Sequence, residues 1–199
     1  MAAFLRQAGH EGPIVLIGEE PIPPYQRPPL SKAYLKGETA RERLQLRPPS
    51  FYAAEGIELV TGAAVVAIDR AGRQVALADG RRRPWDLLAL TTGATPRRLP
   101  AAIGGALDGV LVMRGLADAD ALAARLAPGA RALVVGGGYI GLEAAAALAG
   151  AGVSVTLVEA AERILARVAA PATADYFRAL HRRHGVDLRE SAGLARLGG

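Results

Sequence analysis

The stretch from Val134 to Glu143 reads VVGGGYIGLE, and it decides the fold. An apolar run precedes it and an alanine-rich run follows it, which predicts a strand, a glycine turn and a helix. Gly136, Gly138 and Gly141 fit the pattern G-x-G-x-x-G. In that pattern the first glycine makes the tight turn, the second lets the backbone approach a pyrophosphate, and the third lets helix and strand pack closely. The stretch therefore predicts a dinucleotide-binding turn.

An acidic residue at the correct distance supports this prediction. A second predicted strand, residues 153–158, leads to Glu159, which follows Gly141 at about the 20-residue spacing of the acid that binds ribose hydroxyls. The start of the intervening helix offers free N–H groups and a partial positive charge to phosphates. A lone glycine pattern is weak, but the complete series of strand, turn, helix, strand and acid favours a dinucleotide site over a ligand-free turn.

Length and composition exclude several classes of protein. The chain has 199 residues, of which 51% are hydrophobic, enough for one large or two small domains with a real core. It has no cysteine, which excludes disulfides, thiolate metal sites and a redox-active cysteine pair, and we predict no metal site. No apolar run approaches the roughly 18 residues of a membrane span, and Met1–Gly9 lacks a secretory pattern. We therefore expect a cytoplasmic protein without a membrane partner.

The charge pattern leaves two interpretations open. The net charge is +5, and most of the basic residues are arginines spread along the chain. This indicates either a compositional bias with a mildly basic surface or an acidic protein partner that is steered electrostatically. Nucleic acid is not expected, because no basic helix or aromatic-interleaved basic patch is present. His10, His181 and His184 have no metal-ligand spacing, and we interpret them as surface histidines.

The N-terminal region repeats the pattern of helix, glycine, apolar strand and acid. Residues 2–8 are helix-favouring, residues 14–17 are an apolar run, and Glu19 and Glu20 follow this predicted strand. This repeat predicts a second Rossmann-like unit. We expect the unit to be incomplete, because the given sequence holds no strand and no glycine loop ahead of Ala2.

The region between the two units begins with a proline-rich loop. The stretch from Pro24 to Lys32 reads PYQRPPLSK, and its prolines disfavour regular helix and strand. Linkers rarely carry tyrosine, arginine, leucine and lysine among prolines, so we interpret the stretch as a functional loop. We expect Ser31 to cap a short helix that runs to Leu35.

Strand and turn patterns fill the rest of this region. We expect strands at residues 57–60, 65–69, 74–77 and 87–90, hairpin turns at Gly72 and at 79–80, and a helix at 116–126. The fold class is therefore α/β, with two Rossmann-like three-layer dinucleotide-binding units, the first incomplete, and a small antiparallel β-meander. Residues 1–110 are predicted to be a partial dinucleotide-binding domain and residues 111–199 a second one, incomplete at its C-terminus, with a junction at 101–109.

Two of these motifs together resemble a known family. The stretches PYQRPPLSK and GGGYIGLE are similar to those of the ferredoxin, rubredoxin and putidaredoxin reductase branch of the FAD-dependent pyridine nucleotide oxidoreductases. Residues 91–97 resemble the A-T-G-x-x-P-R segment of that branch, with Thr91 in place of alanine, and Trp85 stands where tyrosine is usual. The resemblance implies that residues 1–110 are a partial FAD-binding domain and residues 111–199 an NAD-binding domain, so that FAD and NAD(H) are bound and NADH passes hydride to the flavin. It further implies that electrons then pass to an acidic iron–sulfur protein of the ferredoxin or rubredoxin type.

The resemblance also implies roles for individual residues. Lys32 and Glu143 are expected to form an ion pair near the flavin ring as the catalytic pair. The alternative for Lys32 is an exposed lysine at the start of a helix. The alternative for Glu143 is an acid at a helix N-terminus that is favoured by the helix dipole. Tyr139 resembles the aromatic residue that shields the flavin, although it also suits simple packing. The expected FAD-binding residues are Glu19, Glu20, Arg27, Lys32, Val65 and Arg114. The expected NAD-binding residues are Gly136, Gly138, Tyr139, Ile140, Gly141, Glu143, Glu159 and Arg167.

The sequence also leads to expectations about the preferred nicotinamide cofactor and about the activity of the chain. A carboxylate at Glu159 favours NADH over NADPH, unless Arg163 and Arg167 reach the 2′ position. In the family the FAD pyrophosphate loop would precede Ala2, and a G-D motif with an interface domain would follow the last residue. We therefore expect the chain to correspond to the middle of the parent fold. The alternatives are an NAD(H)-binding module without turnover and a truncation product without catalytic activity.

Overall fold

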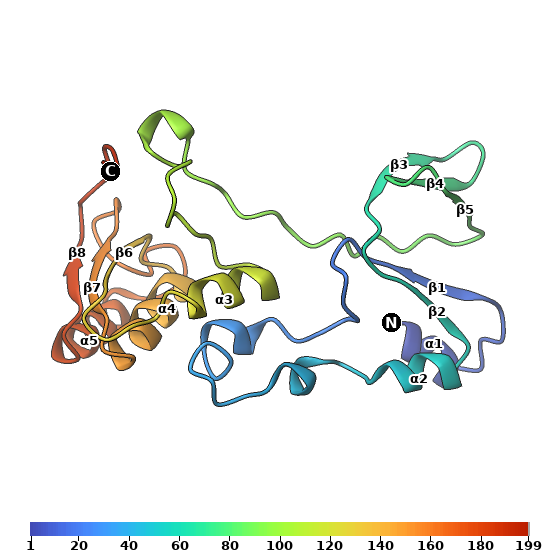
Figure 1. Ribbon diagram of the computed structural model, residues 1–199, viewed down its shortest axis with the longest axis horizontal. Helices are drawn as coiled ribbons and strands as arrows, with labels where there is room; N and C mark the ends of the chain where they lie inside the picture. Colours follow the sequence, from blue (N-terminus) through green and yellow to red (C-terminus); the bar gives the residue numbers. More distant parts are fainter. Residues whose placement is uncertain (199) are drawn as a thin grey trace. The chain divides into compact units, whose positions relative to one another are not determined.

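The computed structural model describes residues 1–198 as a mixed α/β protein with two compact units (Figure 1). Unit 1 comprises Met1–Gln26 and Leu44–Gly93, and unit 2 comprises Arg27–Arg43 and the chain from Ala94 onward. The proline-rich loop beyond Arg27 thus belongs with the C-terminal part of the chain. The functional boundary near residue 110 stays a prediction.

Unit 1 begins with a small parallel sheet and two short helices. The elements are α1 (Ala2–Gln7), β1 (Ile14–Ile17), α2 (Pro49–Ala54) and β2 (Ile57–Val60). β1 pairs in parallel with β2, so that Ile14 lies opposite Ile57. Ala2, Tyr52 and Ile57 form the buried core of this part, because each helix places its apolar face against the strands.

An antiparallel meander completes unit 1. It consists of β3 (Val65–Asp69), β4 (Gln74–Leu77) and β5 (Arg82–Pro84). The strand expected at residues 87–90 is wrong, since Leu87 is 93% exposed and the third strand is β5. The tight turn at Gly80 brings the chain back at once, so that Gln74 already pairs with Pro84. β5 reads RRP, so a search for apolar strands does not find it.

The proline-rich loop forms a short 3₁₀ helix. This element, η1, spans Pro28–Ser31, and two further 3₁₀ turns follow, η2 (Arg41–Leu44) and η3 (Ala101–Ile103). The expected helix from Ser31 to Leu35 is wrong, because Ser31 is the last residue of η1 and turns follow it. Prolines suit the first turn of such a helix, where no N–H donor is needed.

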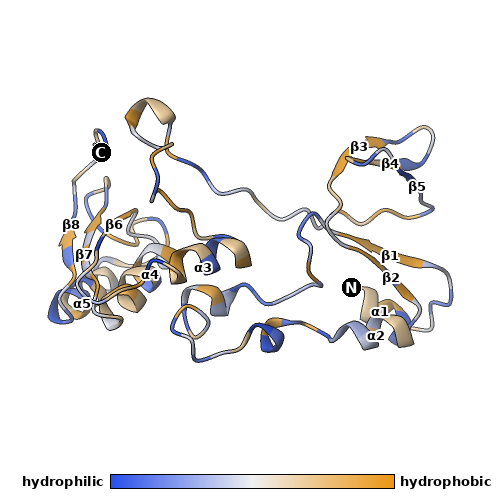
Figure 2. Ribbon diagram, viewed as in Figure 1, coloured by the Kyte–Doolittle hydropathy of each residue, from blue (hydrophilic) through white to orange (hydrophobic). Residues whose placement is uncertain are grey.

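Unit 2 is built around a parallel sheet of three strands. Its helices and strands are α3 (Leu116–Ala123), β6 (Arg131–Val135), α4 (Tyr139–Gly150), β7 (Ser154–Val158), α5 (Pro171–Arg183) and β8 (Asp187–Arg189). The strand order is β6-β7-β8, with α4 and α5 as the crossover helices. Leu148, Leu157 and Ile164 lie in its buried core. Figure 2 colours the ribbon of this unit by the hydropathy of its residues. The predicted α/β class with Rossmann-like units and a β-meander is confirmed.

One histidine is buried, which corrects the expectation that all three lie on the surface. His181 in α5 is only 7% exposed. Its Nδ1 lies 2.8 Å from the carbonyl oxygen of Phe177, and its Nε2 lies 3.1 Å from that of Leu142 in α4. The imidazole therefore bridges two neighbouring helices, a role that residue spacing alone does not reveal.

No helix within residues 1–198 combines the length and the apolar character needed to span a membrane.

Candidate functional site

The three motif glycines meet three different structural requirements. Gly136 has φ of +107°, a conformation that favours glycine. A Cβ on Gly141 would lie 2.0 Å from the carbonyl oxygen of Gly136, so only glycine allows α4 to approach β6 this closely. A Cβ on Gly138 would have no atom of residues 1–198 within 4 Å, so the described part of the chain leaves this position open. The turn thus packs tightly against the start of α4 at Gly141, and it leaves space at Gly138, where a ligand would approach.

The carboxylate of Glu159 is held against this turn. Its Oε2 accepts a hydrogen bond of 2.6 Å from the N–H of Gly137, and its Oε1 accepts one of 2.8 Å from the N–H of Ala161. Glu159 directly follows β7, whose last residue Val158 pairs with Val135 at the end of β6. The acid and the glycine turn therefore meet at the carboxyl edge of the sheet, where open α/β sheets bind their ligands.

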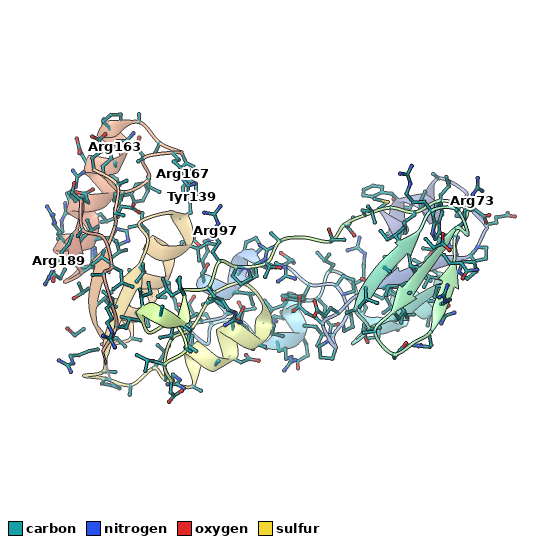
Figure 3. The ribbon with its side chains drawn as sticks, turned by 90° about the horizontal axis from the view of Figure 1, so that it is seen from above. Arg73, Arg97, Tyr139, Arg163, Arg167 and Arg189 are labelled. Atoms are coloured by element: carbon teal, nitrogen blue, oxygen red, sulfur yellow. The ribbon has the colours of Figure 1, made fainter. Side chains whose placement is uncertain are left out.

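The first turn of α4 faces this edge. Gly138 is the N-cap residue without a side-chain cap, and Tyr139 and Ile140 are 56% and 50% exposed. The first N–H groups of a helix have no partner within the helix, so they are available to an anion. Figure 3 shows Tyr139 with Arg163 and Arg167, which lie on the loop after β7.

The two arginines of that loop differ in their contacts. Arg163 donates to the carbonyl oxygens of Ala169 at 3.0 Å and Ala166 at 3.2 Å, and so closes the loop on itself. Arg167 is exposed. Arg163 is thus engaged in holding the loop, which leaves Arg167 as the arginine here that suits contact with a dinucleotide.

Lys32 and Glu143 come together within unit 2. Lys32 Nζ lies 2.9 Å from Glu143 Oε1, and Ser31 Oγ donates a hydrogen bond of 2.6 Å to Glu143 Oε2. Ser31 is buried, whereas the side chains of Lys32 and Glu143 are 52% and 30% exposed. A partly exposed ion pair contributes at most about 1 kcal/mol to stability, so the pair orients the two side chains more than it stabilises the fold.

The rest of the loop is also attached to unit 2. Arg27 Nη1 donates to the carbonyl oxygen of Arg114 at 2.9 Å, and Arg114 Nε donates to that of Ala94 at 3.0 Å. Tyr34 donates its hydroxyl to Asp120 Oδ1 in α3 at 2.5 Å. This hydrogen bond raises the pKa of Tyr34, because it stabilises the protonated phenol.

The remaining expected residues lie in unit 1. Glu19 and Glu20 follow the carboxyl end of β1, as Glu159 follows that of β7. Glu20 Oε2 accepts a hydrogen bond of 2.6 Å from the Tyr25 hydroxyl, and Glu19 is exposed. Val65 begins β3 and is 43% exposed.

Three residues of this site are not among the expected binding or catalytic residues. Ser31 holds Glu143, Gly137 holds Glu159, and Glu190 accepts a hydrogen bond of 2.8 Å from the N–H of Ile164 in the loop after β7. Because Ser31 directly precedes Lys32 in the sequence, its position could have indicated a role near Glu143. The contact of Glu190 joins residues 26 positions apart, so no local pattern indicates it.

Comparison with known proteins agrees with this geometry. Residues 1–198 match the family described as pyridine nucleotide-disulphide oxidoreductase. A probable ferredoxin reductase, CtmF from Castellaniella defragrans, is 45% identical over 199 residues, which are 100% of this chain and 48% of that protein. Putidaredoxin reductase CamA from Pseudomonas putida is 46% identical over 191 residues, or 95% of this chain and 45% of that protein. The chain thus spans about half the length of the curated relatives it matches.

Solved structures give the same result. A chain in the covalent putidaredoxin reductase–putidaredoxin complex matches with a TM-score of 0.92 and 43% identity, covering 99% of this chain and 48% of that one. A ferredoxin reductase from Rhodopseudomonas palustris matches with a TM-score of 0.93 and 39% identity, covering 100% and 48%. The glycine turn, the strand-end acid and these likenesses over the full described length establish that the chain belongs to the pyridine nucleotide-disulphide oxidoreductase family.

Proposed function

We propose that unit 2 binds NADH at the carboxyl edge of β6 and β7. The pyrophosphate would lie over Gly138 at the start of α4, and Glu159 would accept the adenosine ribose hydroxyls. The observation that carries this proposal is the open position at Gly138 beside a carboxylate already held by Gly137. A carboxylate oxygen can accept more than one hydrogen bond, so Glu159 can keep its backbone contacts and still bind ribose.

The protein would use this NADH as an FAD-dependent ferredoxin-type reductase. When bound, FAD supplies the step that accepts hydride and releases single electrons. Each unit carries residues that fit FAD. In unit 1, the acids Glu19 and Glu20 follow the end of β1. In unit 2, Lys32 lies beside Glu143. The family resemblance assigns FAD-binding roles to Glu19, Glu20 and Val65 within unit 1. It assigns the same role to Arg27, Lys32 and Arg114 within unit 2.

The proposed partner is an acidic iron–sulfur protein of the ferredoxin or rubredoxin type in the cytoplasm. The net charge of +5 and the names of the relatives, which include ferredoxin and putidaredoxin reductases, support it. The alternative is NAD(H) binding without turnover. Adding NADH and a ferredoxin to a flavin-loaded chimera, which carries the flanking segments of the putidaredoxin reductase relative, distinguishes them, because only a reductase reduces the ferredoxin.

Three glycine substitutions in one helical region test the binding site itself. Gly138→Ala adds a methyl group that would contact no atom among the described residues, so the free energy of unfolding should stay nearly unchanged while NADH binding weakens by roughly tenfold or more. Gly150→Ala, in the last turn of the same helix and also in open space, is the matched control and should bind NADH like the wild type. Gly141→Ala should lose both stability and binding. Unchanged NADH affinity in Gly138→Ala, measured by fluorescence titration, would contradict the proposed site.

A further inference from the structure

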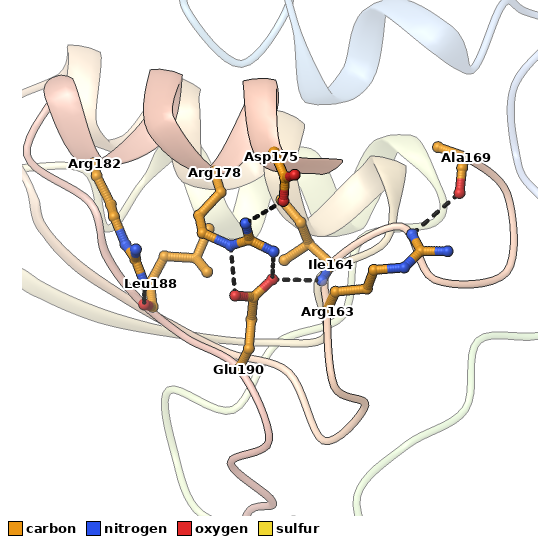
Figure 4. Close-up of polar contacts among 8 residues, drawn as sticks. All are labelled: Arg163, Ile164, Ala169, Asp175, Arg178, Arg182, Leu188 and Glu190. Atoms are coloured by element: carbon orange, nitrogen blue, oxygen red, sulfur yellow. Dashed lines mark hydrogen bonds and ion pairs between the residues drawn. The ribbon is translucent and has the colours of Figure 1, made fainter. Parts of the chain in front are cut away.

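A largely buried ion pair contacts the loop that follows β7. Arg178 in α5 donates through Nε to Glu190 Oε2 at 2.5 Å and through Nη2 to Glu190 Oε1 at 2.9 Å, while its Nη1 contacts Asp175 Oδ1 (Figure 4). The side chains of Arg178 and Glu190 are only 21% and 13% exposed. Such a two-bond arginine–carboxylate contact fixes both groups more firmly than a single contact. We call this pair the Arg178–Glu190 clamp.

The clamp holds the loop that follows β7. Glu190 Oε1 accepts the N–H of Ile164 at 2.8 Å, and the Ile164 side chain is completely buried. The next residue, Leu165, has φ of +53°, a conformation that L-residues rarely adopt and that surrounding contacts must maintain. The loop therefore depends on fixed neighbours, and Glu190 provides one of them.

The same loop holds the glycine turn. Leu165 donates its N–H to the carbonyl oxygen of Gly137 at 3.0 Å, and the N–H of Gly137 donates to Glu159. A Cβ on Gly137 would lie 2.6 Å from Ile164 Cγ2, so the loop and the turn are in direct contact. An unbroken series of contacts thus runs from Glu190 through Ile164 and Leu165 to the turn and its acid.

We propose that Glu190, braced by Arg178, is a positioning residue for the dinucleotide site. It keeps Ile164 and Leu165 against Gly137, and so keeps the glycine turn and the Glu159 carboxylate in the geometry that ribose and pyrophosphate need. This inference rests on the proposed NADH site and adds a residue outside the glycine motif on which its affinity depends.

The experiment compares Glu190→Ala, Glu190→Gln and Asp187→Ala. Asp187 and Arg189 form an exposed ion pair within β8, the strand that directly precedes Glu190. Asp187→Ala is therefore the matched control for loss of a carboxylate. NADH affinity is measured by fluorescence titration at a temperature where circular dichroism shows each variant folded. Hydrogen exchange of the ligand-free protein is measured in peptides that cover residues 133–138 and 159–166.

Glu190→Ala should weaken NADH binding by about tenfold or more, the change expected for one lost hydrogen bond to a charged group, and should speed exchange in both peptides. Glu190→Gln keeps an acceptor for Ile164 and should restore most of the affinity, and Asp187→Ala should match the wild type. If Glu190→Ala is unfolded, Arg178→Lys, which keeps the charge but loses the two-bond contact, should weaken binding to a smaller extent.

Wild-type affinity in a folded Glu190→Ala protein, or in Arg178→Lys where that variant replaces it, would overturn the inference. So would no rescue by glutamine, or an equal loss in Asp187→Ala. A wild-type chain that does not bind NADH would instead overturn the proposed function, and the inference with it. The two failures are therefore distinguishable.

Discussion

Lys32 and Glu143 form an ion pair in which the lysine Nζ lies 2.9 Å from one carboxylate oxygen, while Ser31 donates to the other at 2.6 Å. Two consecutive residues at the end of η1 thus occupy both oxygens of one carboxylate in α4. This places a lysine at a defined position beside the candidate NADH site, and its consequence for the reaction can be measured.

If Lys32 and Glu143 act together, Lys32→Met and Glu143→Gln should be strongly non-additive in the rate of hydride transfer. Contacting charged residues typically show interaction energies of about 0.5–3 kcal/mol. The rate is measured by stopped-flow flavin absorbance in a flavin-loaded chimera that carries the flanking segments of the putidaredoxin reductase relative. Additive effects of the two substitutions would show that the residues work independently.

Glu159 should make the site prefer NADH to NADPH, because a carboxylate accepts two ribose hydroxyls and repels a 2′-phosphate. Replacing Glu159 by alanine should weaken NADH binding by about tenfold or more and reduce the preference. Calorimetric titration of both dinucleotides measures this. The matched control is Glu162→Ala, which removes an exposed carboxylate from the same loop. NADPH binding as tight as NADH binding in the wild type would refute the prediction.

The 199-residue chain should purify colourless and still bind NADH. Its sequence holds a single G-x-G-x-x-G stretch, the one at Gly136, whereas FAD needs a glycine turn of its own for its pyrophosphate. Each missing charge-assisted hydrogen bond is worth roughly 1.5–3 kcal/mol, so losing several weakens binding on the order of 10³-fold. Absorbance of the purified chain provides the measurement. About one flavin per chain would mean that another part of the fold, or a second chain, holds the pyrophosphate.

Glu190 should make stability depend on pH in the acid range. Burial alone raises the pKa of Glu190, but hydrogen bonds from Arg178 and from the N–H of Ile164 together outweigh it, and the pKa is lowered. An unfolded glutamate titrates near about 4.3, so as the pH falls below this value the unfolded chain binds the proton first and stability decreases.

The wild type should therefore exceed Glu190→Gln in free energy of unfolding by a constant amount from about pH 7 to about pH 5, and the difference should shrink below about pH 4. Urea unfolding at each pH provides the comparison. Because Asp175 also contacts Arg178 and is present in both proteins, the difference isolates Glu190. A difference that does not change down to pH 3 would contradict the prediction.

Local sequence alone determined the parts of this protein that depend on backbone conformation. The turn at Gly136 needs a positive φ, and Gly141 must lack a Cβ so that α4 can approach β6. Such requirements restrict the residue type at a fixed spacing, so the motif can be read in the chain. The strand patterns that became β1, β2, β6 and β7 are equally local, since the apolar residues of each strand lie close together in the sequence.

Tertiary structure alone decided the partners of the side chains whose roles local sequence did not indicate. The sequence-based expectations for Ser31 and His181 were wrong, and Glu190 had none, because their partners are Glu143, Leu142 and Ile164, each on a different element. A serine, a histidine or a glutamate suits many local settings, so its own neighbours in sequence do not specify its role. The role follows only when folding brings a distant carbonyl, carboxylate or N–H within hydrogen-bonding distance, because the energy of that contact depends on position in space.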